Sequence, residues 1–261
     1  MGTPPSILEQ ILAVKRAEVA DLKSYGDHIY PRDGWGRSLA AALRRDANQP
    51  VRVLAEIKRA SPSAGPIRPD ADPVAVARDY EAAGAAAISV LTDRTFFAGD
   101  AQFLAPVVAA TRVPILRKDF IIDGEQIREA SACGADAVLL IVAALGEGEL
   151  ARLLGSARAY YVEALVEAHT LAEADAALAA GARLLGVNHR DLRTFAIDMS
   201  LTEQIAKRVP GDVVLVAESG IRSRDDVRRM GDAGAHAVLV GEHLMRAPSP
   251  GAALRELLGT T

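Results

Sequence analysis

The sequence lacks paired cysteines and long apolar runs, and each shortage excludes a class of protein. Its single thiol, Cys133, can form no internal disulfide and no cysteine-rich zinc site, so we expect a buried, inert residue. No stretch reaches the ~20 consecutive apolar residues of a transmembrane helix. The amino-terminal MGTPPSILEQ lacks a basic region followed by a long apolar run, so we expect no secretory signal. We therefore expect a cytoplasmic protein.

The chain also lacks a strong charge of either sign. Its formal net charge is -4 and its basic residues are scattered among acidic ones, so we expect neither nucleic acid nor a membrane as a partner. Half of its 261 residues are hydrophobic and a quarter are charged, which is ordinary for a globular protein. The length slightly exceeds that of a typical single barrel of alternating strands and helices.

A repeated pattern fills most of the chain. A short apolar run is followed by a loop, an alanine-rich helix and a Gly-Ala or Pro stop. Nearly continuous apolar runs are typical of parallel strands buried on both faces, and their spacing matches a βα unit. The runs cover residues 51–58, 85–92, 113–120, 135–142, 161–167, 182–188, 212–219 and 236–242.

The helices between these runs carry clear end signals. Capping pairs occur at Asp123 with Gln126, and at Ser223 with Asp226. Asp72-Pro73 has the composition of a helix start, and Gly-Ala pairs such as Gly134-Ala135 mark helix ends. Eight units with no GxGxxG motif after the first strand favour a closed barrel over an open sheet.

We therefore predict an α/β protein, a single (β/α)₈ TIM-barrel domain over residues 1–261, with a helical extension at 1–50 and the barrel at 51–261. Within the extension we expect a helix from Ser6 to about Lys23, with Glu9 completing a capping box, and a shorter helix from Trp35 to Asp46. The extension could plug the bottom of the barrel or form a flap at the active-site face, and the sequence leaves both possibilities open.

Charged residues end several of the predicted strands. Catalytic groups of such barrels lie at the carboxyl ends of the strands. Glu56 and Lys58 end the first strand, Lys118 the third, Glu167 the fifth and Glu218 the seventh. Residues two apart share a face of a strand, so these side chains should converge on the barrel mouth. An internal salt-bridge network is the alternative, but buried ion pairs stabilise a fold poorly, and such a cluster suits proton transfer better.

Glycines after the last two strands predict a phosphate site. Ser219-Gly220 follows the seventh strand and Gly241-Glu242 the eighth. Glycine lets backbone N–H groups approach an anion, and barrels often bind phosphate between these two loops and a short helix, here predicted from about Gly241 to Met245. The sequence shows no Ser-His-Asp set. We expect His169 and His189 in loops near the mouth and His236 in a structural role at the opposite end.

At these residues the sequence resembles the indole-3-glycerol phosphate synthases, over essentially the whole chain. AEIKRASPSAGPI (55–67) together with RKDF (117–120) carries the most specific resemblance. Other matching segments are LTDRTFFAG (91–99), GADAVLLIVAAL (134–145), ALVEAHT (164–170), GVNHRDL (186–192), VAESGI (216–221) and AVLVGEHLM (237–245).

The resemblance implies ring closure, with loss of CO₂ and water, of 1-(2-carboxyphenylamino)-1-deoxyribulose 5-phosphate in tryptophan synthesis, by a monomer that needs no cofactor or metal. It implies that Lys118 is the general acid that protonates the ribulose carbonyl as the aromatic carbon attacks. Lys58 would pair with a substrate anion and assist dehydration, and Glu56 and Glu167 would act as acid–base and orienting groups. The sequence does not decide which of these three handles the dehydration proton.

The resemblance also implies binding roles. Glu218 and Asn188 would hold the intermediate, and Phe97 and Phe120 would form the walls for the anthranilate ring. The phosphate and substrate lining would consist of Ser61, Ser219, Gly220, Gly241 and Glu242. His189 and Asp100 depart from the commonest family pattern.

Two alternatives are a barrel of the phosphoribosylanthranilate isomerase type and a non-catalytic binding barrel. A barrel of the isomerase type should carry a cysteine at the end of the first strand. A non-catalytic barrel should lack the charged residues at the strand ends.

Overall fold

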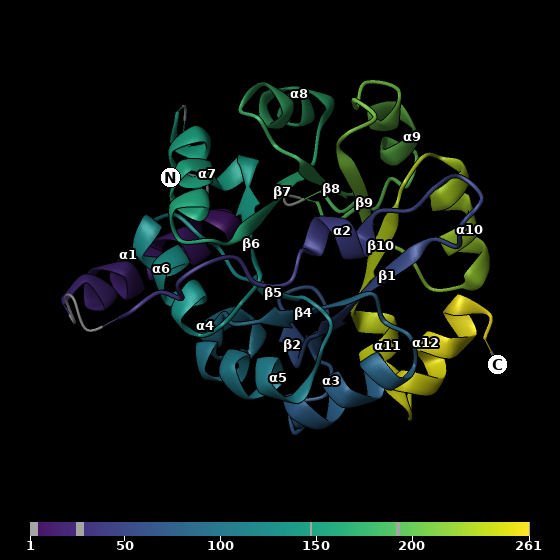
Figure 1. Cartoon of the computed structure of the whole chain (residues 1–261), viewed down its shortest axis with the longest axis horizontal. Coiled ribbons are helices and arrows are strands. Elements are labelled where there is room, and N and C mark those ends of the chain that lie inside the picture. The colour runs from purple at the N-terminus through teal and green to yellow at the C-terminus, as the bar shows by residue number, and fades with distance from the viewer. Residues whose placement is uncertain (1–4, 25–28, 147, 192–193, 261) are drawn as a thin grey trace.

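Eight parallel strands close into a barrel in the computed structural model of the chain, which describes residues 5–24, 29–146, 148–191 and 194–260. The ring closes because β1 pairs with both β4 and β10 (Figure 1). The predicted α/β barrel is therefore confirmed. Its strands are β1 (Arg52–Ile57), β4 (Ala87–Leu91), β5 (Ile115–Lys118), β6 (Ala137–Ile141), β7 (Glu163–Ala168), β8 (Leu184–Asn188), β9 (Val214–Glu218) and β10 (Ala237–Val240).

Most strands are one or two residues shorter at each end than the apolar runs predict. The run over 113–120 forms only Ile115–Lys118, because Asp119 and Phe120 leave the ladder in a turn where the Asp119 carboxylate accepts the Phe120 N–H. A two-stranded hairpin after β1, made of β2 (Ala60–Ser61) and β3 (Gly65–Pro66), was not predicted.

Helices surround the barrel and begin at the expected caps. Both sides of the capping box are present at Asp123 with Gln126 and at Ser223 with Asp226. The helices that cover the strands are α3 (Pro73–Ala82), α5 (Leu104–Ala110), α6 (Gly124–Ala132), α7 (Glu149–Ala159), α8 (Leu171–Ala179), α9 (Leu201–Ala206), α10 (Arg224–Asp232) and α12 (Pro250–Leu258). Two short helices, α4 (Arg94–Phe97) and α11 (Glu242–Arg246), follow strand ends, and α11 confirms the helix expected after the last strand.

Alternation along the strands divides the apolar residues between two cores. On β1, Val53, Ala55 and Ile57 belong to the outer core under the helices, whereas Leu54 belongs to the core inside the barrel. Glu56 shares the inward face with Leu54 because side chains alternate along a strand. The same alternation therefore carries the strand-end charges into the interior at one end of the barrel.

The second helix of the extension closes the other end of the barrel. This helix, α2 (Leu39–Leu43), inserts the fully buried Leu39 and Leu43 into the inner core, near the centre of the barrel in Figure 1. Glu163, at the start of β7, accepts hydrogen bonds from the Ser38 hydroxyl and the Ala40 N–H, at 2.7 and 2.8 Å. α2 is therefore the plug at the amino-terminal face.

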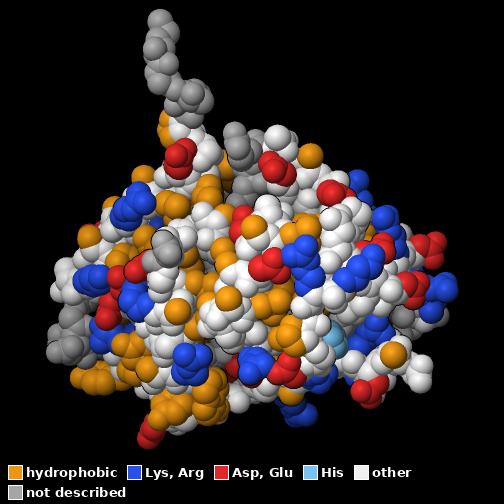
Figure 2. Space-filling view, turned by 90° about the horizontal axis from the view of Figure 1, so that it is seen from above, with side chains coloured by type: hydrophobic (Ala, Val, Ile, Leu, Met, Phe, Trp, Pro, Cys, Tyr) orange, Lys and Arg blue, Asp and Glu red, His pale blue; other side chains and the backbone are white. Residues whose placement is uncertain are grey.

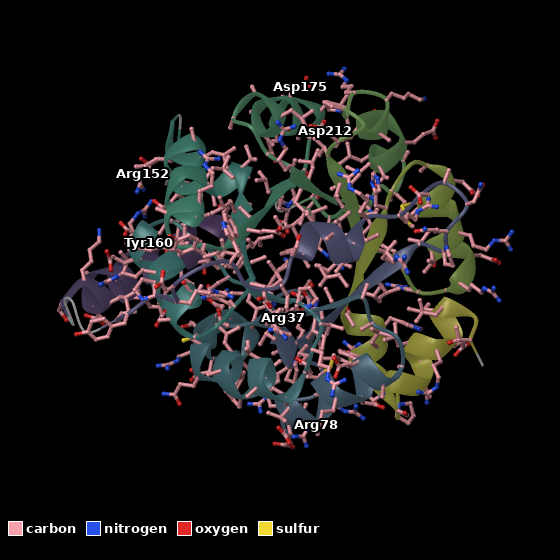
Figure 3. The ribbon with its side chains drawn as sticks, viewed as in Figure 1. Arg37, Arg78, Arg152, Tyr160, Asp175 and Asp212 are labelled. Atoms are coloured by element: carbon pink, nitrogen blue, oxygen red, sulfur yellow. The ribbon has the colours of Figure 1, made fainter. Side chains whose placement is uncertain are left out.

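The predicted helix from Trp35 to Asp46 is wrong in length. Ser38 caps the observed helix and Arg44 is already extended. Before α2, Arg37 bonds Asp136 and the Thr111 carbonyl, so the linker is fastened to the barrel; Figure 3 shows Arg37 over the barrel and Arg78 at the periphery. Carbonyl groups and charged side chains of the barrel thus provide hydrogen-bond partners for this segment. The segment therefore need not form a longer helix to satisfy its polar groups.

The first helix, α1 (Ile7–Ser24), begins at the Ser6 and Glu9 capping pair, as predicted. Within the described ranges we find no helix whose length and apolar character would let it span a bilayer. Figure 2 shows basic and acidic side chains intermingled on one face of the molecule.

Candidate active site

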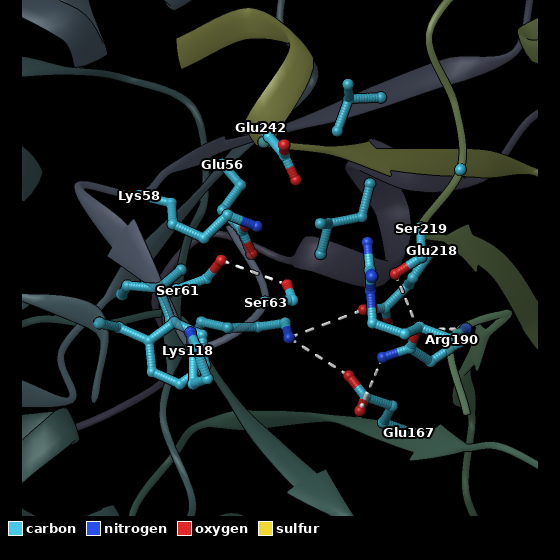
Figure 4. A pocket seen from close by; sticks show the side chains of 18 of the residues that line it. Glu56, Lys58, Ser61, Ser63, Lys118, Glu167, Arg190, Glu218, Ser219 and Glu242 are labelled. Carbon is cyan, nitrogen blue, oxygen red and sulfur yellow. Dashed lines mark hydrogen bonds and ion pairs between the residues drawn. The ribbon is translucent and has the colours of Figure 1, made fainter. Parts of the chain in front are cut away.

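A cavity of about 490 Å³ opens at the carboxyl ends of the strands (Figure 4). Every site residue predicted from the sequence lines it: Glu56, Lys58, Ser61, Phe97, Lys118, Phe120, Glu167, Asn188, Glu218, Ser219, Gly220, Gly241 and Glu242. The structure thus brings these side chains to one place, and their individual roles stay predictions.

Lys118, the last residue of β5, lies between two carboxylates. Its Nζ is 3.2 Å from Glu167 Oε2 and 3.7 Å from Glu218 Oε2 (Figure 4). Burial alone would lower the pKa of Lys118, but the charges of Glu167 and Glu218 outweigh burial and raise it. Lys118 is therefore an ammonium whose proton can be released only when its surroundings change, for example when charge develops on a bound substrate.

The two carboxylates beside Lys118 are shifted in opposite directions. Burial favours the neutral form of Glu167, but Lys118, the nearby His169 and the amide donor of Asn188 outweigh burial and lower its pKa. Burial and the neighbouring Glu167 raise the pKa of Glu218 well above its usual range. Titratable groups whose environments separate their pKa values are the usual basis of acid–base chemistry. These opposite shifts favour the negative charge on Glu167 over Glu218.

A second ion pair lies at the end of β1. Lys58 Nζ is 2.6 Å from Glu56 Oε1, and Glu56 is almost fully buried. Gly241 makes room for it, since a Cβ at that position would overlap the Glu56 carboxylate. The glycine predicted for phosphate contact thus also has a steric role. On the loop after β1, Ser61 Oγ lies 3.4 Å from Ser63 Oγ.

The loop after β9 has an unusual backbone. Ser219 and Gly220 both have positive φ, at 72° and 84°. The Ser219 hydroxyl donates to Asn188 Oδ1 at 2.8 Å, which offsets part of the strain of a non-glycine residue in the left-handed region. Successive residues of this kind can form a concave anion site from backbone N–H groups. Glu242 faces the same cavity and is paired with Arg246 at 3.0 Å.

An apolar wall completes the cavity. The rings of Phe97, at the end of α4, and Phe120, after β5, lie 5.9 Å apart between centroids and tilt by 39°. Ile7, Leu8 and Ile11 of α1 line the same cavity. The first helix is therefore a flap at the active-site face, so the extension provides both structures considered from the sequence: α2 is the plug and α1 is the flap.

One lysine fastens this flap to the rim. Lys15 Nζ lies 2.9 Å from Asp93, which caps α4, and 2.8 Å from Asp119, beside Lys118. Its side chain is 1% exposed, and Glu18 supplies a third contact at 2.8 Å. Burial lowers the pKa of Lys15, but Asp119 and the other carboxylates outweigh burial and raise it. α1 is thus tied to the segment that carries the central ammonium.

Sequence reasoning missed several cavity residues. Arg190, Arg222 and Arg246 add positive charge to the cavity, and His243 also lines it. Arg190 could have been predicted from the sequence. It follows Asn188, the last residue of β8, by two positions, and side chains two positions apart along an extended chain point the same way. The others follow loops or helix turns whose direction the sequence does not reveal.

His189, His236 and Asp100 have largely structural surroundings. His189 is buried, with Nδ1 2.8 Å from the Ser219 carbonyl and Nε2 2.7 Å from Thr202 Oγ1, and burial lowers its pKa. His236 accepts the Leu215 N–H at the opposite end of the barrel, as expected of a structural residue. Asp100 caps a short turn. The two departures from the family pattern therefore lie outside the cavity lining.

A closed barrel with charged side chains at the carboxyl ends of its strands is the architecture of (β/α)₈-barrel enzymes. A family model described as "Indole-3-glycerol phosphate synthase" matches residues 8–257. The chain belongs to the indole-3-glycerol phosphate synthase family, whose members are carboxy-lyases of tryptophan biosynthesis.

Individual relatives agree with this assignment. The indole-3-glycerol phosphate synthase of Carboxydothermus hydrogenoformans is 51% identical over 219 residues, 84% of this chain and 83% of the relative. That of Rhodospirillum rubrum is 44% identical and covers 97% of this chain and 99% of the relative. Among solved structures, the thiamine phosphate pyrophosphorylase of Pyrococcus furiosus matches with a TM-score of 0.64 at 19% identity, over 84% of this chain and 96% of its own. That likeness concerns the fold alone.

Proposed function

We propose that the cluster around Lys118 closes the indole ring of 1-(2-carboxyphenylamino)-1-deoxyribulose 5-phosphate, with release of CO₂ and water. The observation that carries this proposal is the position of Lys118 Nζ between Glu167 and Glu218, in a cavity walled by Phe120. As the aromatic carbon attacks the ribulose carbonyl, Lys118 gives its proton to the carbonyl oxygen. This transfer neutralises the oxyanion, and loss of CO₂ from the attacking ring carbon, which carries the carboxylate, restores the aromatic ring.

Dehydration then needs an acid for the departing hydroxyl and a base for the proton left on the ring. Two pairs are available: Lys58 with Glu56 at 2.6 Å, and Glu218 with Glu167 beside Lys118. We assign the hydroxyl to Lys58, since its side chain is more exposed to the cavity than Glu56. Once Lys118 has given its proton to the carbonyl, Glu218 returns a proton to Lys118 and so becomes ionised. Glu218 can then accept the ring proton, because its raised pKa makes its carboxylate a strong base.

The two sides of the cavity bind the two ends of the substrate. Phe97 and Phe120, with the apolar residues of α1, hold the anthranilate ring. The phosphate binds between Ser219-Gly220 and Gly241, where backbone N–H groups meet the positive charge of Arg222. An anion found elsewhere in a ligand-bound crystal structure would refute this placement.

We also propose that the chain is one domain, a barrel at 51–261 with its extension at 1–50, and acts as a cytoplasmic monomer without nucleic acid. The extension supports the first point, since α1 and α2 both contribute to the barrel through buried residues. The mixed charge and the net value of -4 support the absence of a nucleic-acid partner. Sedimentation velocity measures the oligomeric state. A sedimentation coefficient of a dimer that persists over a tenfold dilution would contradict the proposed monomer.

The activity itself is tested by adding purified protein to the carboxyphenylamino-deoxyribulose phosphate and recording indole fluorescence, with and without EDTA. We expect fluorescence to rise at the same rate in both samples, because the proposed steps use only side-chain acids and bases. Absence of product from well-folded protein would contradict the proposed reaction.

A further inference from the structure

His169 lies directly behind the candidate catalytic carboxylate Glu167. Its Nε2 is 3.2 Å from Glu167 Oε1 and its Nδ1 is 3.3 Å from Glu173 Oε2, in the first turn of α8. The first contact is an ion pair rather than a directed hydrogen bond. His169 is 7% exposed and is absent from the described residues that line the cavity. It can therefore influence the reaction only through Glu167.

The backbone holds this histidine in place. Its N–H donates to Glu173 Oε2 at 2.8 Å, and Thr170 caps α8 through the Glu173 N–H. The turn η3 (Val142–Ala144), which packs against both β7 and α8, brings no titratable side chain. The described charges that face His169 from its own loop and its neighbours are Glu167 and Glu173, and Lys118 lies on the far side of Glu167.

The site holds two carboxylates but one central ammonium. Glu167 and Glu218 both contact Lys118, and two buried carboxylates beside one cation favour retaining a proton on one of them. The two differ in their partners. Glu167 has Lys118 at Oε2 and the Asn188 amide at Oε1, at 3.2 Å each. The Oε1 atom of Glu218 has no hydrogen-bond partner among the described residues.

We infer that His169 is a positioning residue whose imidazolium fixes the negative charge of this carboxylate pair on Glu167 and leaves the proton on Glu218. Lys118 then faces one full carboxylate charge instead of two, so it can release its proton to the substrate more easily. Burial lowers the pKa of His169, but Glu167 and Glu173 outweigh burial and raise it to about 10, which keeps the imidazolium charged at neutral pH. The inference rests on the proposed roles of Lys118 and Glu167.

The test compares His169→Gln and Glu173→Gln with a matched control, His236→Gln, at the opposite end of the barrel. In His169→Gln we expect kcat to fall about tenfold to a hundredfold, the effect of losing one charged partner of a buried carboxylate. KM should change less than about twofold, because His169 does not touch the substrate. His236→Gln should keep the kcat of the wild type.

Glu173→Gln keeps the histidine and removes its outer carboxylate, so the imidazolium loses its proton at lower pH. The alkaline limb of the kcat profile should therefore move to lower pH, which a purely structural effect of the substitution would not produce. A wild-type kcat in His169→Gln, or an unmoved alkaline limb in Glu173→Gln, would overturn the inference.

A second readout does not depend on turnover. In protein labelled with ¹³C at glutamate side-chain carboxyl carbons, substitutions to Gln assign the Glu167 and Glu218 signals. We expect the wild type to show Glu167 ionised and Glu218 protonated at neutral pH, and His169→Gln to shift both signals toward shared protonation. If the two signals are the same in His169→Gln as in the wild type, the charge assignment is refuted, whether or not the protein is active. If the wild type forms no product, that result counts only against the proposed reaction.

Discussion

Replacement of Lys15 by methionine tests how the flap is held. The change keeps the apolar stem and removes the ammonium that pairs with Asp93 and Asp119, whose side chains are 0% and 2% exposed. Loss of one partner of a buried ion pair costs about 3–5 kcal/mol. At about 2–4 °C per kcal/mol for a chain near this size, Tm should fall by roughly 6–20 °C.

Lys23→Met is the matched control. Lys23 lies on the same helix and pairs with Asp123 at 2.6 Å, but it is 53% exposed. Exposed pairs contribute about 0–1 kcal/mol, so its Tm should fall by no more than about 4 °C. Calorimetry of the two variants and the wild type in one buffer measures the difference. Equal losses in Lys15→Met and Lys23→Met would refute the reasoning.

The loss of Tm caused by Lys15→Met should also depend on pH. Burial raises the pKa of Asp119, but Arg117 and Lys15 outweigh burial and lower it. A carboxyl group whose pKa is lower in the folded state stabilises the fold at pH values above its pKa in the unfolded chain, which is near 3.9. That stabilisation is lost as the pH falls through the pKa of the folded state. A protonated Asp119 no longer needs the charge of Lys15. The Tm difference between wild type and Lys15→Met should therefore be full at neutral pH and shrink below about pH 4.

Three further changes separate the other parts of the site. Gly241→Ala should lower kcat by about tenfold or more, because the added Cβ displaces the Glu56 carboxylate; steady-state rates equal to wild type would contradict this. Phe97→Ala should raise KM by about tenfold with little loss of kcat, as expected of uniform binding of the ring, and an unchanged KM would count against the aromatic wall. Glu163→Gln should lower the free energy of unfolding by about 1–3 kcal/mol in urea titrations and leave kcat unchanged, since it weakens only the bond to the α2 plug.

The barrel could be predicted because its signals are local. Buried parallel strands read as apolar runs, and caps such as Asp123 announce the helices. The central acid–base cluster followed from the same reading, because alternation places Glu56 and the other strand-end charges inside the barrel mouth. Such arguments need only the period of a strand and the rule that active sites lie at strand ends.

The remaining features depend on contacts distant in sequence. Whether α1 covered the mouth or the bottom was decided by Lys15 and its pairs with Asp93 and Asp119, which no local pattern reveals. The hairpin formed by β2 and β3 has strands of two residues, too short for any periodicity. The burial of His189 similarly arises from Thr202, on a separate helix.

The most direct test of the central claim is a kinetic comparison of Lys118→Met with the wild type, with substrate affinity measured separately by titration of the quenched protein fluorescence. The proposed proton transfer predicts that kcat falls by about 10²–10⁴-fold, the usual contribution of a general acid. Circular dichroism and substrate affinity should stay close to those of the wild type. A folded Lys118→Met protein that forms indole at a rate within a few fold of the wild type would contradict the assignment of Lys118 as the acid that closes the ring.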